Sequence, residues 1–222
     1  FSTVEKRSKK WGRDDVVELV VGMNGSHVKD LKTGQFWQNE WIPAAAMQQL
    51  YEKFKDSGAE FIISDENYVY NNAFTSHAKW IQESDMLTYV ETDYTEELKK
   101  DWPKLAISFM PEELEMVAIQ TTVHRDDLSG NVASKWTIEY THANASKGKG
   151  IELLAKEEGV SLDEVWAFGD ADNDLSMLKV CGKALVMANG TDNAKALADE
   201  ILPPNTEDGI AQFIEKYLKE DK

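Results

Sequence analysis

Carboxylates cluster directly after a short apolar run in the last third of the chain. The segment from Val165 to Asp174 reads Val-Trp-Ala-Phe-Gly-Asp-Ala-Asp-Asn-Asp. An unbroken apolar run is typical of a strand that is buried on both faces of a parallel sheet. Ligands bind just beyond the carboxyl ends of such strands, where Asp170 would lie. Because its carboxylate oxygens suit a hard cation, the segment predicts a magnesium ligand at Asp170.

Two other interpretations also fit a cluster of carboxylates, a calcium loop and a solvated acidic turn. In a helix-loop-helix calcium site that begins at Asp170, the required glycine would fall at Leu175 and the bidentate glutamate at Cys181. Both positions fail, so the sequence excludes this calcium site. The solvated turn stays open, because carboxylate clusters are common in loops.

A second chemical signal lies between an expected strand and an expected helix. Residues 146–150 read Ser-Lys-Gly-Lys-Gly. The glycines let the backbone approach an anion, the helix amino end attracts negative charge, and a lysine offers a point charge to a phosphoryl oxygen. The spacing is not that of a Walker phosphate loop, and an ordinary exposed loop also fits. Segment 165–174 comes one helix and one strand later, so both loops are expected at the same edge of the sheet.

The composition limits the kinds of protein that this chain can be. Its 222 residues, 42% of them hydrophobic, suit one large domain or two modest ones. Lys plus Arg number 24 and Asp plus Glu number 40, a net charge of −16, which argues against broad binding to nucleic acid or to an anionic membrane. The single cysteine, Cys181, cannot form an internal disulfide, and no Cys/His cluster indicates zinc. Neither a membrane span nor a secretory signal is visible, so we expect a cytoplasmic protein.

Hydrophobic periodicity predicts alternating strands and helices. The expected strands are 16–21, 35–41, 61–63, 68–70, 105–110, 136–140, 165–168 and 184–187. The expected helices are the stretch 2–11, one opened by Pro43, one starting at Pro111–Leu114, then 150–158, 175–180, 193–198 and a last helix with Ile210, Phe213, Ile214, Tyr217 and Leu218 on one face. Alternation near the carboxyl end implies right-handed crossovers and a parallel sheet, whereas the middle resembles a separate α+β unit. Taken alone, Asn24-Gly25 predicts a hairpin turn.

Together the two chemical segments resemble the Cof-type branch of the haloacid dehalogenase (HAD) superfamily of phosphatases. That family's third motif is a lysine in a Ser-Lys-Gly setting, which Lys147 matches. Its fourth motif, Gly-Asp-x-x-Asn-Asp, is matched by Gly169, Asp170, Asn173 and Asp174. The stretch 205–211 also resembles the family's end. The resemblance is strong over residues 134–222 and weaker over 1–27, and the middle matches a type II α/β cap in position and size.

The resemblance implies an α/β fold: a Rossmann-like parallel-sheet HAD core with an inserted α/β cap domain. We expect residues 1–27 to be an amino-terminal remnant of the core, 28–133 to be the cap and 134–222 to be the carboxy-terminal part of the core. On this view Asn24-Gly25 closes a core strand before the chain enters the cap, in place of a hairpin.

The sequence departs from the family pattern near its amino end. The first motif, Asp-x-Asp-x-Thr, which supplies the nucleophile and the general acid/base, does not occur in these residues. The second motif, a Thr or Ser before Gly-Arg, is also absent, and Phe1–Glu5 resembles the stretch immediately after that motif. We therefore expect that an amino-terminal part of the core is missing and that the 222 residues alone are inactive.

The resemblance implies a magnesium-dependent phosphatase that hydrolyses small phosphorylated metabolites, such as sugar phosphates, through an aspartyl-phosphate. In the implied site Asp170 binds Mg²⁺, with Asp174 as a further candidate metal ligand. Lys147 contacts the phosphoryl group, Asn173 orients phosphate or water, and Asp174 holds the loop or the Lys147 side chain. Lys149, Glu139 and His142 are weaker candidates.

The cap would choose the substrate, and the partner would be a small phosphorylated metabolite bound by a monomer or homodimer. The alternative is a non-catalytic phosphometabolite-binding or regulatory protein on the same frame.

Overall fold

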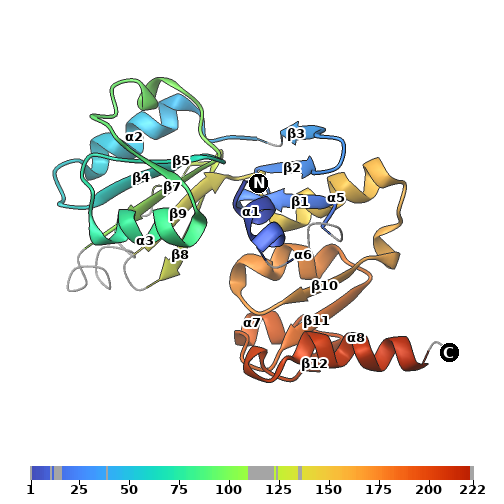
Figure 1. The fold of residues 1–222 in the computed structure, drawn as a ribbon. Coiled ribbons are helices and arrows are strands. Elements are labelled where there is room, and N and C mark those ends of the chain that lie inside the picture. Colours follow the sequence, from blue (N-terminus) through green and yellow to red (C-terminus); the bar gives the residue numbers. More distant parts are fainter. Residues whose placement is uncertain are drawn as a thin grey trace. The chain divides into compact units, whose positions relative to one another are not determined.

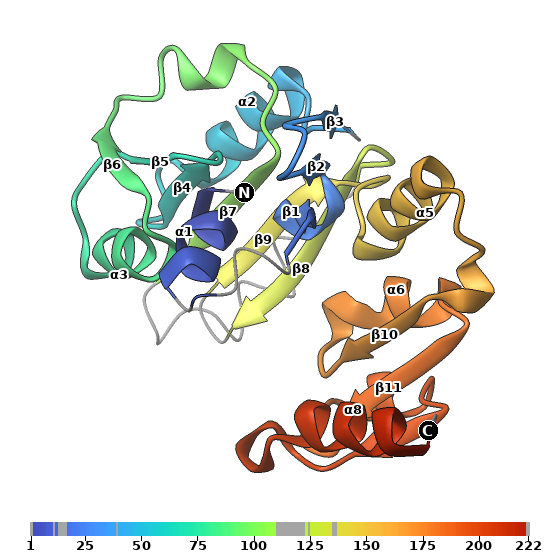
Figure 2. The same cartoon turned by 45° about the vertical axis from the view of Figure 1, so that its right-hand side comes forward.

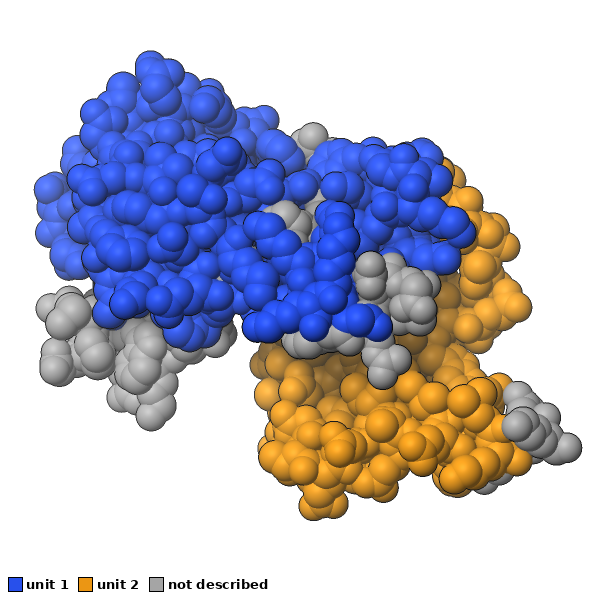
Figure 3. Space-filling view, in the orientation of Figure 1, with its two compact units in different colours: residues 1–145 blue, residues 146–222 orange. Residues whose placement is uncertain are grey.

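Three β-sheets organise the described residues, and the sheet nearest the carboxyl end is parallel (Figure 1). The computed structural model describes residues 2–10, 12, 17–38, 40–109, 123, 125–134 and 137–220. The chain divides into two compact units, unit 1 (residues 1–145) and unit 2 (residues 146–222), which Figure 3 shows in different colours.

Unit 2 contains the parallel sheet and the two segments singled out in the sequence. Its strands run in the order β10 (Trp166–Gly169), β11 (Lys183–Met187) and β12 (Glu200–Leu202). Its helices are α5 (Lys147–Glu158), α6 (Leu175–Val180), α7 (Asp192–Lys195) and α8 (Gly209–Glu220), and its short 3-10 turns are η3 (Leu162–Glu164), η4 (Asp172–Asp174) and η5 (Asn205–Glu207). The parallel pairing of β10 with β11 and of β11 with β12 confirms the predicted sheet type.

Both faces of this sheet are covered by helices (Figure 2). Ala184 and Val186 of β11 pack in one cluster with residues of α6 and α7. Leu185 and Met187, which alternate with them, pack with Phe213 of α8 on the other face. Successive side chains of a strand point to opposite faces, so burial on both sides explains the unbroken apolar run.

The predicted apolar face of α8 is only partly buried in unit 2. Phe213 is 8% exposed, but Ile210, Ile214, Tyr217 and Leu218 are between 40% and 59% exposed. The helical periodicity was therefore a sound guide to the helix and a poorer guide to which of its residues pack.

In unit 1 the Asn24-Gly25 pair forms the hairpin that the residues alone predicted. The helix α1 (Ser2–Lys10) precedes an antiparallel sheet of β1 (Leu19–Gly22), β2 (His27–Asp30) and β3 (Phe36–Gln38). The turn between β1 and β2 is η1 (Met23–Gly25), where Asn24 has φ 55° and Gly25 has φ 97°, in the left-handed region that these two residue types tolerate. The expectation that the chain enters the inserted region directly after this pair is corrected: it turns back and pairs with β1 first.

A six-stranded sheet forms the larger part of unit 1. Its order is β6 (Thr88–Glu91), β5 (Tyr68–Asn71), β4 (Glu60–Ser64), β7 (Lys104–Ser108), β9 (Thr137–His142) and β8 (Leu128–Ser134). Neighbouring strands are antiparallel except β5 and β6. The accompanying helices are α2 (Ala44–Phe54), α3 (Ser76–Asp85) and the short η2 (Glu97–Lys99).

The place of β9 in this sheet differs from the predicted domain boundary at residue 134. Its residues 137–142 were expected in the carboxy-terminal part of the core, yet they pair with β7 and β8. Likewise residues 28–38, expected in the cap, lie in the hairpin sheet with β1. Local periodicity does not show which sheet a strand joins, and the bounds of the inserted cap stay a prediction.

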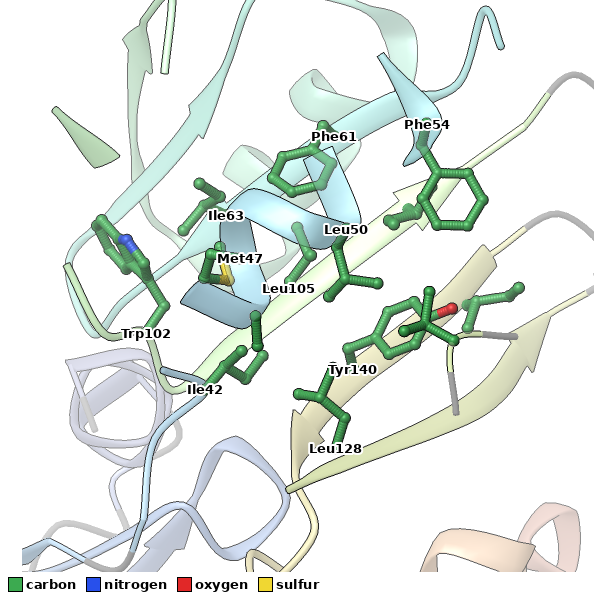
Figure 4. Packing of buried hydrophobic residues seen from close by; sticks show 14 of the residues in the cluster. Ile42, Met47, Leu50, Phe54, Phe61, Ile63, Trp102, Leu105, Leu128 and Tyr140 are labelled. Atoms are coloured by element: carbon green, nitrogen blue, oxygen red, sulfur yellow. The ribbon is translucent and has the colours of Figure 1, made fainter. Parts of the chain in front are cut away.

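The six-stranded sheet is packed on both faces. Met47 and Leu50 of α2 lie over Phe61 and Ile107, and Figure 4 shows the centre of this cluster. Ile62, the strand neighbour of Phe61, belongs to a second cluster on the opposite face, where Ile81 of α3 joins it. The six-stranded sheet therefore lies between α2 on one face and α3 on the other.

Several predicted elements match the structure closely. Pro43 precedes α2, Gly159 ends α5 with φ 67°, and α6 spans the predicted residues 175–180. The helix α3 and the strands β2, β6, β8 and β12 were not predicted. Val16, Trp136 and the helix start expected at Pro111–Leu114 lie outside the described residues. Among the described helices, none combines the length and apolar character needed to cross a membrane.

Replacing Leu50 by Ala tests the packing of α2. Leu50 is fully buried, so we expect unit 1 to lose about 2–5 kcal/mol of unfolding free energy through lost burial and a residual cavity. Urea unfolding of the two proteins measures this difference. Glu52→Ala on the exposed side of the same helix is the control and should change stability little; equal losses in the two variants would contradict this packing.

Candidate active site

One buried carboxylate joins the two segments that the sequence singled out. Asp174 Oδ1 lies 2.5 Å from Lys147 Nζ. Asp174 Oδ2 accepts the backbone N–H groups of Asp170 (2.9 Å) and Ala171 (3.1 Å). The Asp174 residue is only 4% exposed. The segments 146–150 and 165–174 therefore meet at the Asp174 side chain. This agrees with the expectation that both lie at the same edge of the sheet.

The start of α5 positions Lys147. The Ser146 hydroxyl caps this helix by accepting the backbone N–H of Lys149 at 3.2 Å. Gly148 N–H donates to Ser176 Oγ of α6 at 3.0 Å. A Cβ on Gly148 would lie 2.4 Å from the Ser176 carbonyl oxygen, so only glycine allows this approach of α5 to α6.

The end of β10 positions Asp170. Gly169 is the last residue of the strand, and a Cβ there would lie 2.9 Å from Asp174 Cβ. The backbone of Asp170 is held by Asp174 Oδ2 on its N–H and by the N–H of Thr191 on its carbonyl (2.9 Å). Its carboxylate is exposed and makes no hydrogen bond or ion pair with any residue that the structure describes. The exposed Asp170 carboxylate thus lies at the carboxyl end of the strand, and its role as a metal ligand stays a prediction.

The environment of Asp174 favours its ionised form. Burial raises the pKa of this carboxyl group, but the Lys147 ammonium and the N–H groups of Asp170 and Ala171 outweigh burial. The net result is a pKa below the ordinary value of 3.8. The carboxylate is therefore charged at neutral pH and pairs with the lysine as an anion.

Asp170 is suited to a magnesium site in which phosphate oxygens fill some of the coordination positions of the ion. Among the described residues no three His, Cys, Asp or Glu side chains are grouped closely enough to hold a metal ion. Mg²⁺ is commonly bound by one or two carboxylates, with water and substrate phosphate filling the remaining positions, so Asp170 alone fits that chemistry. Both oxygens of Asp174 already accept hydrogen bonds, which supports its loop-holding role. Its role as a metal ligand stays a prediction.

The remaining candidates differ in their surroundings. Asn173 lies exposed in η4, directly before Asp174. Lys149 forms an exposed ion pair with Glu152 at 2.6 Å, which is typical of a solvated helix surface.

Two weaker candidates belong to unit 1 and already have partners there. Glu139 pairs with Lys104 and accepts the Asn24 side-chain N–H at 3.3 Å. His142 Nε2 lies 3.0 Å from Glu40 Oε2.

Sequence reasoning missed the side chains that hold the aspartate loop from the β11 side. Asp172 accepts hydrogen bonds from Thr191 and Asn193, which come after β11. The only local signal was that Thr191, a residue type that often caps helices, stands just before the predicted helix 193–198; its Oγ1 accepts the Ala194 N–H.

The family is shown by comparison with known proteins. The sequence model of the haloacid dehalogenase-like hydrolase family matches residues 2–214. This chain belongs to that family. The predicted fold class is confirmed, because solved members of the same family share the fold: a haloacid dehalogenase-like hydrolase from Bacteroides thetaiotaomicron has a TM-score of 0.82, covers 97% of this chain and 82% of its own, and is 19% identical.

Two curated relatives are similar over parts of the chain. Phosphatase YwpJ of Bacillus subtilis is 34% identical over 114 residues, which is 51% of this chain and 40% of the relative. Pyridoxal phosphate phosphatase YbhA of Escherichia coli is 40% identical over 81 residues, 36% of this chain and 30% of the relative. The matched stretch thus spans less than half the length of each relative.

The charge on Asp174 predicts how stability depends on pH. Its folded-state pKa lies below 3.8, so the ionised carboxylate stabilises the fold above that pH, and this contribution is lost as the pH falls through the folded-state pKa. We expect Asp174→Asn to be less stable than the natural chain at neutral pH and to lose less stability on acidification. Urea unfolding from neutral pH to about pH 3 measures both, and parallel curves for the two proteins would refute the assignment.

Proposed function

We propose that this chain carries the magnesium- and phosphate-binding residues of a phosphatase that acts on small phosphorylated metabolites, such as sugar phosphates. The observation that supports the proposal most directly is the Asp174 carboxylate, which holds Lys147 and the backbone of Asp170 in one site. Membership of the haloacid dehalogenase-like hydrolases and the two phosphatase relatives support the reaction class. One relative is named for pyridoxal phosphate, which is a small phosphorylated metabolite.

Lys147 is proposed to bind the phosphoryl group. An ammonium group has three N–H donors, and one of them is directed to Asp174. Two donors remain for phosphoryl oxygens. The pair with Asp174 fixes the position of the ammonium group before substrate arrives. The Lys147 side chain therefore loses little conformational freedom when substrate binds.

Asp170 is proposed to hold Mg²⁺, which when bound neutralises charge on the transferring phosphoryl group. The backbone of Asp170 is fastened on both its N–H and its carbonyl, while its carboxylate stays exposed to receive the ion. Asn173, exposed in η4, is proposed to orient a phosphoryl oxygen or a water molecule.

The bond-forming step needs a residue that the motif match does not supply. The resemblance implies a nucleophilic aspartate and an aspartyl-phosphate, but the Asp-x-Asp-x-Thr motif does not occur in the 222 residues. Lys147, Asp170 and Asn173 are therefore proposed to bind and position the phosphoryl group, and not to form the new bond.

The test uses the product of the complete reading frame that encodes these residues. We expect it to release phosphate from a panel of phosphorylated sugars and pyridoxal phosphate, and to require Mg²⁺. Asp170→Ala should lower turnover by about 100-fold or more, since it removes charge stabilisation from the reacting group. Asp163→Ala, an exposed aspartate of the same unit, is the matched control and should leave turnover unchanged.

Each other outcome has a definite meaning. Full turnover by Asp170→Ala would reject the metal assignment. Saturable binding of phosphorylated metabolites without phosphate release by the natural protein would reject the phosphatase and favour the non-catalytic binding protein.

A further inference from the structure

The aspartate between the two motif carboxylates has both of its oxygens engaged. Asp172 Oδ1 accepts the Thr191 hydroxyl at 2.7 Å, and Asp172 Oδ2 accepts the Asn193 side-chain N–H at 3.2 Å. Asp172 lies in η4, whereas Thr191 and Asn193 stand at the start of α7. We call these three residues the Asp172 bracket. It fastens the loop after β10 to the loop after β11.

Backbone contacts also join the two loops that the Asp172 bracket connects. The Thr191 N–H donates to the Asp170 carbonyl oxygen at 2.9 Å. A Cβ on Gly190 would lie 2.9 Å from that oxygen, so the β11–α7 loop lies directly against Asp170. Thr191 Oγ1 also accepts the Ala194 N–H at 3.3 Å and so caps α7. Thr191 therefore ties Asp172, Asp170 and α7 to one another.

Asp174 and the Asp172 bracket hold the backbone of Asp170 at two different atoms. Asp174 accepts the Asp170 N–H, and Thr191 donates to the Asp170 carbonyl. The Asp172 carboxylate meanwhile faces Thr191 and Asn193, so two aspartates separated by one residue take different roles. Both residues are exposed, but the Asp172 carboxylate is engaged by hydrogen bonds, whereas that of Asp170 is left without a partner among the described residues.

We propose that Thr191 and Asp172 are positioning residues for a divalent cation bound by Asp170, an inference that rests on the proposed function. A metal-binding side chain that is already oriented by its neighbours loses less conformational entropy when the metal binds. Removal of such neighbours commonly lowers metal affinity by about tenfold or more. Asp170 would offer the cation a carboxylate whose backbone is already held at both its N–H and its carbonyl. Thr191 contributes through its hydroxyl, and Asp172 acts as the acceptor for that hydroxyl and not as a ligand.

The experiment measures Mn²⁺ binding to the protein by paramagnetic broadening of the Asp170 and Ala171 amide signals, with Mg²⁺ as competitor, because Mn²⁺ and Mg²⁺ share carboxylate ligands. Thr191→Val keeps the side-chain shape and loses the hydroxyl. We expect it to bind Mn²⁺ about tenfold more weakly than the natural protein. Thr191→Ser should restore the natural affinity. Asn193→Ala, which removes only the bond to Asp172 Oδ2, should weaken binding in the same direction but less.

Thr75→Val is the matched control. Thr75 also caps a helix through the Ala78 N–H (3.0 Å) and donates its hydroxyl to a carboxylate, Glu60 (2.8 Å), but it lies in unit 1. It should lose a similar amount of thermal stability and keep the natural Mn²⁺ affinity.

The outcomes separate this inference from the proposed function. Unchanged affinity in Thr191→Val, or equal weakening in Thr75→Val, would overturn the positioning role while leaving Asp170 as a ligand. Tighter binding in Thr191→Val would also overturn it, since a released Asp172 would then be acting as a ligand. If the natural protein shows no saturable broadening at Asp170, the metal site of the proposed function fails, and the inference fails with it.

Discussion

The ion pair between the buried Asp174 and the partly exposed Lys147 is the interaction on which the site depends. Asp174 is only 4% exposed, so its carboxylate loses most of its hydration, and this cost must be offset by groups that favour its charge. Here one ammonium group and two backbone N–H groups do so. Because those donors come from the start of α5 and from the end of β10, satisfying one buried charge fixes two loops at the same edge of the sheet.

The glycines of the two segments make this meeting sterically possible. Gly148 lets α5 approach the backbone of Ser176, and Gly169 leaves room for the Asp174 side chain beside the last residue of β10. A side chain at either position would press on atoms that set the distance between Lys147 and Asp174. The glycines in both segments thus serve close packing of the backbone around the carboxylate, in addition to any approach of a phosphate.

The sequence was most informative where short-range pattern and chemistry agree. An apolar run followed by Gly-Asp predicted β10 and the exposed Asp170 at its end, and helical spacing predicted α6 with its observed bounds. It was least informative where partners are distant along the chain. The alternation in residues 136–140 is the same for any strand, so it could not reveal that β9 pairs with β7 and β8. The Asp172 carboxylate finds its donors 19 and 21 residues later, and only the folded loop brings them together.

The most direct test of the account is a double-mutant cycle on Lys147→Met and Asp174→Asn. Trp166 is the only tryptophan in unit 2, so the resonance of a fluorinated tryptophan at that position reports the unfolding of this unit in urea. We predict that the two single changes are strongly non-additive, with a coupling of about 1 kcal/mol or more, because each leaves the other group without its partner. Additive effects would show that Lys147 and Asp174 act independently, and would contradict a site built on their contact.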